Sequence, residues 1–540
     1  MSANLSHLSG KKGIRKGVFR DFVARSKQHV LGRDDFKSLH ETSLFGKASL
    51  HGTASFYDFL RPDEAHIQVR VCSGTCCELT GKQDALHDAL AAHVPAADIG
   101  HLACVGRCYE NTAFQWRDQT FSGDADLASV FAGRPVAQAP IPVHATAQRF
   151  LTGAPLDLST FLTRLDAVFA APADVVLREV HASGLRGRGG AGFPLARKLE
   201  SCQAAEGETK FVVCNADEGD PGAFSDRYLL EEQPFLVLLG MAIAARVVGA
   251  DAAILYIRAE YPEALRAVDA AISAIEAHGV PHDLEFIAVS GAGSYVCGEE
   301  TALLSSLEGQ RPEVRVRPPF PVHQGLFLQP TLVSNVETLA CLPTIVAQGA
   351  AAFAQVGTSK SSGTKLVCLD GTFHRPGVYE VPMGTPLSLI LHDLGGGTRA
   401  PVKAFQIGGP LGGVVPATQV DSLTLDFESL HSHGFLLGHA SIVGIPTRVP
   451  MIDLIAHLFA FTAAESCGKC YPCRIGSQRG LELVNASREV PISRALFADL
   501  LETLEIGSLC ALGGGLPLPI HNVLTHFHDE LAPFFVGGEK

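Results

Sequence analysis

The sequence predicts an α/β multidomain protein. Its 540 residues are enough for roughly three to five domains. Between about residues 150 and 345, helical stretches alternate with short apolar strands such as FVVC at 211 and AAILYIRAEY at 252, a pattern typical of a parallel sheet. One group of cysteines precedes this region and a second lies near the C-terminus. These observations predict an α/β centre between two smaller units that bind metal.

The part before this centre divides into three predicted segments. Residues 1–60 form a basic N-terminal arm. Residues 61–135 form a small α/β unit, because HIQVRVC alternates as a strand does and KQDALHDALAAHV has helical spacing. Residues 136–150 are predicted to be a linker, because GRPVAQAPIPVHATAQ contains three prolines and no acidic residue.

The α/β centre itself is predicted to span residues 151–350, and two further units follow it. In 363–391 a strand, a Gly/Pro turn, a second strand and a helix-like run predict a β-grasp, ubiquitin-like unit over 351–440. From 451 onward the periodicity is mostly helical, which predicts a helical domain over 441–540.

Charge excludes one class of partner. The net charge is −13, although residues 1–33 contain eight Lys or Arg and the single acid Asp21, so the remainder carries about −20. This balance argues against nucleic acid as the main partner. The basic start is more typical of a partner-docking arm than of a mitochondrial transit peptide. No membrane span is predicted, because the uncharged stretch 338–359 contains Pro343 and Gly349 and is typical of a soluble helix.

The 14 cysteines carry the clearest chemical signal. Clustered cysteines in a large chain without a recognisable signal peptide indicate metal binding in a reducing, cytoplasmic compartment. Cys467, Cys470 and Cys473 follow a C-x2-C-x2-C pattern, and Cys510 supplies a distant fourth thiol. This spacing favours a [4Fe–4S] cluster over structural zinc, which prefers two separate C-x2-C pairs.

The first cysteine group has a different spacing. It contains the pairs Cys72-x4-Cys77 and Cys104-x3-Cys108. Neither is a C-x2-C pair, so a thioredoxin-type dithiol is disfavoured, and the spacing is also unusual for zinc. A [2Fe–2S] centre is therefore predicted. The spacing alone leaves open whether Cys76 or Cys77 is the ligand.

A glycine-rich loop, SGLRGRGGAGFP at 183–194, has the G-x-G-x-x-G spacing of a dinucleotide fingerprint. In a Rossmann fold a strand precedes that motif. Here the lead-in ADVVLREVHASGLR has helical spacing, so we do not predict a classical Rossmann site. The loop can cradle a phosphate with its backbone N–H groups, helped by Lys198, or it can be a tight turn between helices.

Acidic residues follow two of the predicted strands. In a parallel sheet such strand ends meet at one edge, where ligands bind, although most acidic residues are solvated surface. Carboxylates there can accept hydrogen bonds from ribose hydroxyls or a carboxamide. Tyr295 or Phe193 could stack on a planar ring, although such aromatics more often belong to a core. The acidic residues are Asp217, Glu218, Asp220, Glu299 and Glu300.

Several motifs, in the same order, resemble the NADH-binding flavoprotein subunit of respiratory complex I and its relatives. They include SGLRGRGGAGFP, CNADEGDPGAFSDR, YVCGEETALLSSLEG, RPPFP, SNVET, ESCGKCYPCR and GSLCALG. The segments VCSGTCC and CVGRC resemble a thioredoxin-like [2Fe–2S] domain. The resemblance covers about residues 65–530 and implies a non-classical, Rossmann-like domain that holds FMN and NAD(H) together.

The resemblance also implies roles for individual residues. Asp220 and Glu300 would meet the nicotinamide nucleotide, and Glu218 and Glu300 would stand at the reaction centre. Cys77 would be the [2Fe–2S] ligand, since Cys76 takes an alanine position of the family. Arg317, Ser334 and Ser201 depart from the family pattern. Residues implied to contact the nucleotide or flavin are Gly187, Gly189, Gly190, Gly192, Phe193, Lys198, Asn215, Asp217, Glu218, Tyr295, Gly298, Glu299 and Asn335.

Fusion of the two cysteine-bearing units looks most like the β (diaphorase) subunit of soluble NAD-dependent molybdenum formate dehydrogenases. This resemblance implies FMN, [4Fe–4S] and [2Fe–2S] as cofactors, NAD(H) as substrate, and a molybdenum-containing catalytic subunit and a small [2Fe–2S] subunit as partners. Alternatives are the diaphorase subunit of an NAD-reducing hydrogenase and a complex I flavoprotein. A function of another class is an electron relay or scaffold that carries clusters without nucleotide chemistry.

Overall fold

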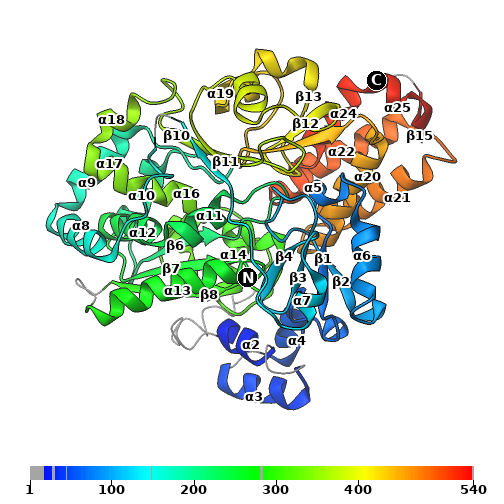
Figure 1. Ribbon diagram of the computed structural model, residues 1–540. Helices are drawn as coiled ribbons and strands as arrows, with labels where there is room; N and C mark the ends of the chain where they lie inside the picture. Colours follow the sequence, from blue (N-terminus) through cyan, green and yellow to red (C-terminus); the bar gives the residue numbers. More distant parts are fainter. Residues whose placement is uncertain (1–17, 27–30, 44–45, 147–148, 280–283, 538–540) are drawn as a thin grey trace.

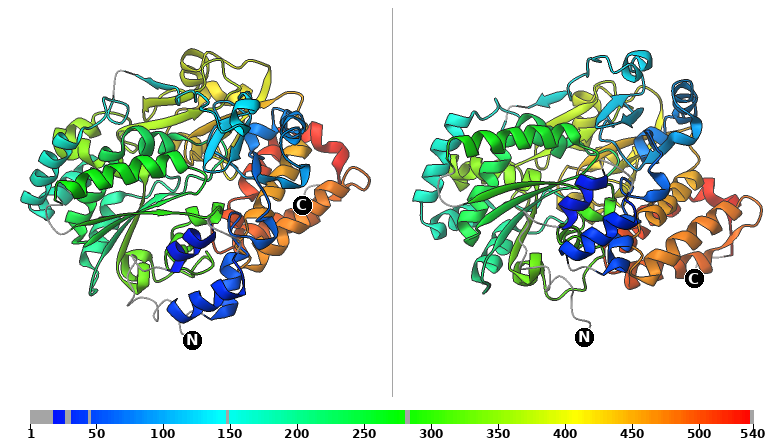
Figure 2. Two further views of the ribbon diagram at one scale, coloured as in Figure 1. Left: turned by 60° about the horizontal axis from the view of Figure 1, so that its bottom comes forward. Right: turned by 90° about the horizontal axis from the view of Figure 1, so that it is seen from below.

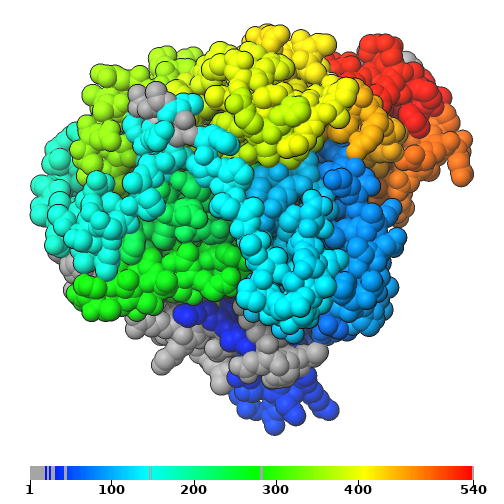
Figure 3. Space-filling model, in the orientation of Figure 1, coloured from blue at the N-terminus to red at the C-terminus, as the bar shows by residue number. Residues whose placement is uncertain are grey.

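The computed structural model describes residues 18–26, 31–43, 46–146, 149–279 and 284–537. A parallel sheet with flanking helices forms the centre (Figure 1). The second sheet lies above it in this view, the helical unit to the right, and the N-terminal helices below. In the space-filling view, the first cysteine unit packs against both the central domain and the second sheet (Figure 3).

The central sheet has the strand order β8-β7-β6-β9, with every neighbouring pair parallel. Its first three strands, in chain order, step outward in one direction, and the fourth returns to the other side of the first. The order therefore reverses between β6 and β9, where Asn215 pairs with Asn335. This confirms the predicted parallel sheet. The strands are β6 (Phe211–Ala216), β7 (Ala252–Ile257), β8 (Glu285–Ser290) and β9 (Thr331–Asn335).

Alternate residues of these strands point to two apolar cores. Val212 and Cys214 of β6 face a core formed with several helices, while Val213 faces the opposite core. This burial on both faces explains why the strands are nearly continuous apolar runs. Helices of the first core are α8 (Leu158–Ala170), α9 (Ala173–Ser183), α10 (Leu195–Ala204), α12 (Pro234–Val248), α13 (Pro262–Ala277), α16 (Val336–Ala340) and α17 (Leu342–Gln348).

In the described part of the chain, no single helix is long and apolar enough to span a membrane. The bent pair formed by α11 (Ser225–Glu232) and α12 passes that test by length and composition, but its apolar residues lie in the core. The predicted helix over 338–359 is instead three short helices, α16, α17 and α18 (Ala350–Ala354). Pro343 begins one and Gly349, with φ of 85°, separates the other two.

The described part of the predicted N-terminal arm is helical and docked. It comprises α2 (Val18–Ser26), α3 (Arg33–Ser43) and α4 (Lys47–Ala54). Phe19 stacks on Tyr256 of β7, and the Tyr57 hydroxyl donates to Ser306 at 2.8 Å. Seen from below, these helices lie between the central sheet and the C-terminal helices (Figure 2). The basic residues Lys11, Lys12, Arg15, Lys16 and Lys27 lie outside the described residues.

The first cysteine unit is a four-stranded sheet of order β2-β1-β3-β4. β1 is parallel to β2 and antiparallel to β3, and β3 is antiparallel to β4. The predicted helix within it is α6 (Gln83–Ala91). The strands are β1 (Val69–Cys72), β2 (Ile99–Leu102), β3 (Ala113–Trp116) and β4 (Gln119–Ser122).

The second sheet has six strands and extends beyond the segment predicted for it. β14 lies after residue 440, and β5 lies within the predicted linker, where it pairs in parallel with β11. Prolines on either side of β5 are compatible with an edge strand, because only one of its sides needs hydrogen bonds. The strands are β5 (Val143–Ala145), β10 (Thr364–Leu369), β11 (Gly377–Pro382), β12 (Val402–Ile407), β13 (Gly413–Pro416) and β14 (Ser441–Pro446).

The C-terminal region is mostly helical, as predicted. A short parallel pair, β15 (Ile492–Ser493) and β16 (Phe535–Val536), closes it. The helices include α20 (Met451–Glu465), α21 (Ser477–Ala486), α22 (Arg494–Gly507), α23 (Ala511–Gly514) and α24 (Pro517–His526).

Candidate functional site

A cavity of about 220 Å³ opens where the strand order of the central sheet reverses. Ligands bind at this place in open α/β sheets, because the loops leaving the two strands diverge there. The second sheet unit contributes Leu411 and His439 to its wall, and the C-terminal region contributes Cys510, Ala511 and Leu512. The central domain lines the rest with Gly189, Asn215, Asp217, Glu218, Gly219, Asp220, Asp226, Tyr295, Val296, Gly298, Glu299 and Asn335.

The glycine loop connects two helices, which confirms that it is not a classical Rossmann loop. α9 ends at Gly184, with φ of 66°, and the next helix begins at Leu195. A Cβ on Gly189 would lie 2.9 Å from Cβ of Asn335, so only glycine lets the loop approach the end of β9 this closely. The Arg188 backbone N–H also donates to Thr338 Oγ1 at 2.8 Å. The loop therefore forms one wall of the cavity through Gly189.

Asn215 and Asp217 follow β6 and shape the cavity floor. The Asn215 amide donates to the Gly298 carbonyl at 2.7 Å, and its oxygen accepts from the Asp217 backbone N–H at 3.2 Å. Asp217 Oδ2 is buried without a hydrogen-bond partner among the described residues. Burial raises the pKa of this carboxyl well above its ordinary value. A buried acceptor without a donor fits a bound group that presents an N–H or O–H.

Tyr295 and Asp220 connect the cavity to the C-terminal region. The Tyr295 hydroxyl donates to Asp220 at 2.6 Å, and its ring packs edge-on against Phe461. A Cβ on Gly219 would approach Cδ2 of Tyr295 to 2.6 Å, so the ring lies directly over the loop after β6. The backbone N–H of Tyr295 donates to Glu465 at 2.9 Å, which fixes its position relative to α20.

Glu299 and Glu300 begin α14 (Glu300–Leu307) and lie beside two cations. Glu299 caps this helix, accepting from the Thr301 and Ala302 backbone N–H groups. Glu300 pairs with Lys198 of α10 and with Arg317, each at 3.1 Å. The predicted residues Lys198 and Glu300 thus meet at a charged cluster in the central domain.

Two exposed phenylalanines lie close in sequence to this charged cluster. Phe193, which directly precedes α10, is 48% exposed, and Phe320, three residues after Arg317, is 50% exposed. Exposed aromatic rings of this kind suit stacking on a planar base. Phe320 belongs to the RPPFP motif, but the sequence did not single it out.

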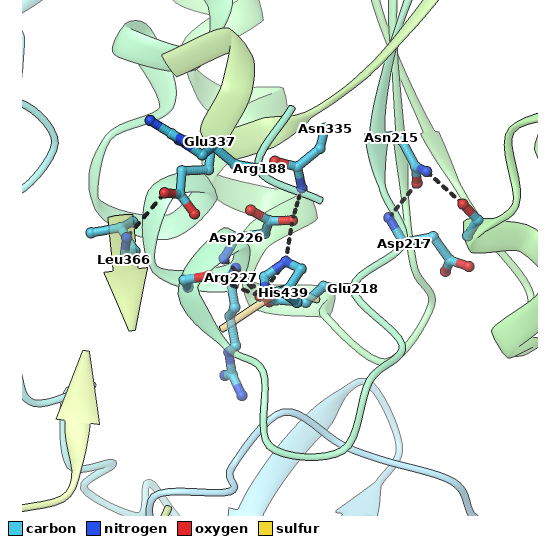
Figure 4. A network of polar contacts seen from close by, with 12 residues as sticks. Arg188, Asn215, Asp217, Glu218, Asp226, Arg227, Asn335, Glu337, Leu366 and His439 are labelled. Carbon is cyan, nitrogen blue, oxygen red and sulfur yellow. Dashed lines mark hydrogen bonds and ion pairs between the residues drawn. The ribbon is translucent and has the colours of Figure 1, made fainter. Parts of the chain in front are cut away.

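Glu218, predicted at the reaction centre, directs its carboxylate toward a helix (Figure 4). It accepts from the backbone N–H groups of Asp226 and Arg227, at 3.0 and 3.1 Å, in the first turn of α11. The Tyr261 hydroxyl also donates to it at 3.1 Å. Burial, together with the charge of Asp226, raises the pKa of Glu218 to about 7. These contacts give Glu218 a part in positioning the loop after β6.

Asp226 and His439 complete this network, and the sequence did not identify either as a site residue. Asp226 accepts from the Asn335 amide at 2.6 Å, and His439 Nε2 lies 3.4 Å from the same carboxylate oxygen. Burial lowers the pKa of His439, but Asp226 outweighs that effect and raises it to about 9. Asp226 belongs to the CNADEGDPGAFSDR motif, whereas His439 comes from the second sheet unit and carries no local signal.

The second cysteine group is brought together as the sequence predicts. Its four thiols belong to one apolar cluster, with Cys467 and Cys473 buried and Cys470 and Cys510 partly buried. The loop around them is tight, since a Cβ on Gly513 would lie 2.7 Å from Cβ of Cys473. Four converging free thiols from one loop and one distant segment fit a [4Fe–4S] cluster.

The first cysteine group is also assembled, and it borders the central domain. Cys104 and Cys108 have sulfurs 3.5 Å apart, and Cys72 lies within reach of both Cys77 and Cys104. Cys76 is buried as well and contacts Cys108. The backbone N–H of Gly222, in the loop after β6, donates to the Cys108 sulfur at 3.2 Å. The geometry therefore contains five thiols at this position.

Both cysteine groups thus border the cavity or the loop that lines it. Cys510 itself lies in the cavity wall, and the first group contacts the loop that also carries Asp217, Glu218 and Asp220. A redox-active ring in the cavity would lie next to a thiolate of the second group. This arrangement suits electron transfer between a cavity ligand and metal clusters.

Comparison with known proteins agrees with this geometry. Residues 180–344 match the Nuo51 FMN-binding domain, and residues 453–533 match the NADH-ubiquinone oxidoreductase-F iron-sulfur binding region. The second F-type subunit of the NADH-quinone oxidoreductase of Rhizobium meliloti is 40% identical over 66% of this chain and 88% of its own length. The HndC subunit of the NADP-reducing hydrogenase of Solidesulfovibrio fructosivorans is also 40% identical, over 66% of this chain and 75% of its own.

A solved structure extends the similarity to almost the whole chain. A chain of the NAD+-reducing [NiFe]-hydrogenase in the air-oxidized state has a TM-score of 0.85 at 31% identity, covering 97% of this chain and 94% of that one. The prediction of an α/β multidomain flavoprotein with FMN and a [4Fe–4S] cluster is therefore confirmed. The chain belongs to the family of F-type NADH-quinone oxidoreductase subunits, flavoproteins that hold FMN and a [4Fe–4S] cluster.

Proposed function

We propose that this chain is the diaphorase subunit of a multisubunit complex, exchanging electrons between NAD(H) and iron–sulfur clusters through FMN. The observation that carries the proposal is the shared wall of the cavity. Residues at the carboxyl ends of β6 and β9 line it on one side, and the cluster ligand Cys510 lines it on the other. FMN, when bound, supplies the conversion between a two-electron hydride and single electrons.

The residues of this chain would position the reactants in this cavity. Gly189, Asn215 and Asn335 form the wall at the switch point, and the unpartnered oxygen of Asp217 is available to a flavin N–H or ribityl hydroxyl. Glu300, held by Lys198 and Arg317, is available to ribose hydroxyls. No proton transfer by a side chain is required for hydride transfer, so these groups act by orientation and electrostatics.

We further propose that the first cysteine unit is thioredoxin-like and holds a [2Fe–2S] centre on Cys72, Cys77, Cys104 and Cys108. Support comes from the convergence of these thiols and from their contact with Gly222 beside the cavity. Support also comes from the hydrogenase chain, because its 97% coverage of this chain includes the first cysteine unit.

The identity of the complex is a separate question. The relatives are subunits of NADH-quinone oxidoreductases and of hydrogenases, so they favour our alternatives over the formate dehydrogenase that the sequence predicted. We therefore propose a diaphorase subunit of an NAD-reducing hydrogenase type. The molybdenum-containing catalytic subunit and the small [2Fe–2S] subunit stay predictions, as does the cytoplasmic location.

An anaerobic titration with NADH tests the proposed function. We expect bleaching of the flavin absorbance near about 450 nm, EPR signals from reduced clusters, and FMN on release from the denatured protein. A Glu300→Gln variant should need about tenfold more NADH for half-reduction, because losing one charged hydrogen bond costs roughly 1.5 kcal/mol.

Glu489→Gln, an exposed change outside the cavity, is the matched control and should titrate like the wild type. Clusters that stay oxidised with NADH, in protein that holds no flavin even after FMN reconstitution, would establish the electron-relay function instead. Unchanged NADH affinity in Glu300→Gln would contradict the role of that residue alone.

A further inference from the structure

His439 reaches the cavity from the second sheet unit, whereas the acidic residues around it belong to the central domain (Figure 4). It precedes β14 and is only 5% exposed. Its Nε2 lies 3.4 Å from Asp226 Oδ2 and 3.5 Å from Glu218 Oε1. All three side chains line the cavity. The network therefore brings one ring nitrogen and two carboxylates together beside the proposed flavin site.

The surroundings of the two carboxylates favour their charged forms. Both oxygens of Glu218 accept backbone N–H groups at the start of α11, where the helix dipole also favours an anion. Asp226 accepts from the Asn335 amide at 2.6 Å. A histidine between two such groups is held as an imidazolium, in agreement with its pKa of about 9.

The same three side chains have the chemistry of a divalent cation site. The donors around Glu218 argue for an imidazolium instead, because N–H and O–H groups already occupy both carboxylate oxygens. An additional metal ion would have to compete with these donors at a distance where each is well formed.

We propose that His439 is a tuning residue whose positive charge offsets Asp226 and Glu218 and thereby raises the reduction potential of the flavin. The inference rests on the proposed function, in which FMN occupies the cavity. A hydride brings two electrons and one proton, so the flavin gains one negative charge unless a second proton follows. A cation in a buried wall stabilises that charge, whereas two unbalanced carboxylates would oppose it.

Potentiometric titration of bound FMN tests this inference, because the midpoint potential does not depend on turnover. We expect His439→Gln to lower the equilibrium constant for FMN reduction about tenfold or more, which is about 30 mV for a two-electron couple. His439→Lys, which keeps a cation, should remain within about threefold of the wild type. His433→Gln, an exposed histidine of the same segment, should leave the potential unchanged.

An unchanged or higher potential in a FMN-loaded His439→Gln protein would overturn the inference and leave the proposed function intact. A stoichiometric divalent metal in the wild type that is lost in this variant would also overturn it. If His439→Gln does not retain FMN, the Lys variant decides, because a large fall in its potential contradicts the role of charge. A wild type that cannot bind FMN overturns the proposed function and this inference together.

Discussion

Cys76 and Cys77 are adjacent, and the structure places both thiols in the first cysteine group. Cys77 lies within reach of Cys72, while Cys76 contacts Cys108. Only four thiolates are needed for a [2Fe–2S] centre. The resemblance selects Cys77, because Cys76 takes an alanine position of the family.

We predict that Cys77→Ala loses the [2Fe–2S] centre, whereas Cys76→Ala keeps it. A missing thiolate leaves one iron without a protein ligand, while removal of the fifth thiol leaves the ligand set complete. Iron content and EPR of the dithionite-reduced proteins measure the difference, and the [4Fe–4S] signal serves as an internal control. Loss of the centre in Cys76→Ala with retention in Cys77→Ala would reverse the assignment.

At the scale of elements, Glu380 of β11 fastens the start of the central domain to the second sheet. Its buried carboxylate accepts from the backbone N–H groups of Phe150, Leu151 and Thr152, at 2.8, 3.1 and 2.9 Å. Thr364 of β10 donates to it as well, at 2.8 Å. This carboxylate holds the segment that directly follows β5.

We predict that Glu380→Gln loosens this segment, because the amide nitrogen of glutamine would face N–H donors. Hydrogen bonds to a charged group contribute roughly 1.5–3 kcal/mol, so local opening should become about 10- to 100-fold more frequent. Hydrogen exchange of the peptide covering 143–152 measures this change. Glu489→Gln, which is exposed, is the control. Unaltered protection in Glu380→Gln would show that the carboxylate does not hold the segment.

Elements with a strong local pattern were predictable, and elements defined by distant partners were not. The strands β6, β7 and β8 are visible in the sequence because both of their faces are buried and their residues are continuously apolar. β5 lies in the segment predicted to be a linker, since three residues between prolines become a strand only by pairing with β11. Motifs contained most of the cavity residues, but His439 approaches from another unit and carries no periodic or spacing signal.

At the scale of the whole molecule, the second cysteine group lies between the cavity and the surface. Cys510 lines the cavity, while Cys470 is partly exposed. Around it stand exposed apolar side chains on three consecutive elements of the C-terminal region. These are Tyr471 (70% exposed), Ile475 (47%), Ile506 (76%) and Leu509 (38%). Exposed apolar residues grouped in this way are typical of an interaction surface.

We expect this apolar surface to dock the electron-transfer subunit of the complex, since electrons leaving the cluster need a partner at its exposed side. Ile506→Glu should weaken that association roughly 100-fold or more, because a charge would be buried without a partner in place of an apolar contact. NADH oxidation with a small artificial acceptor should stay at the wild-type rate, because the cavity is untouched. Co-purification with the other subunits and titration by light scattering measure the association.

Val490→Glu is the matched control for this surface. Val490 is 70% exposed, but it follows α21, a helix of ten residues that spans about 15 Å and leads away from the cysteines. If exposed apolar area alone governed association, both variants would dissociate equally. Dissociation by Ile506→Glu and not by Val490→Glu would locate the electron exit at the cluster. Retention of the complex in Ile506→Glu would place the exit elsewhere, with the first cysteine group as the remaining route.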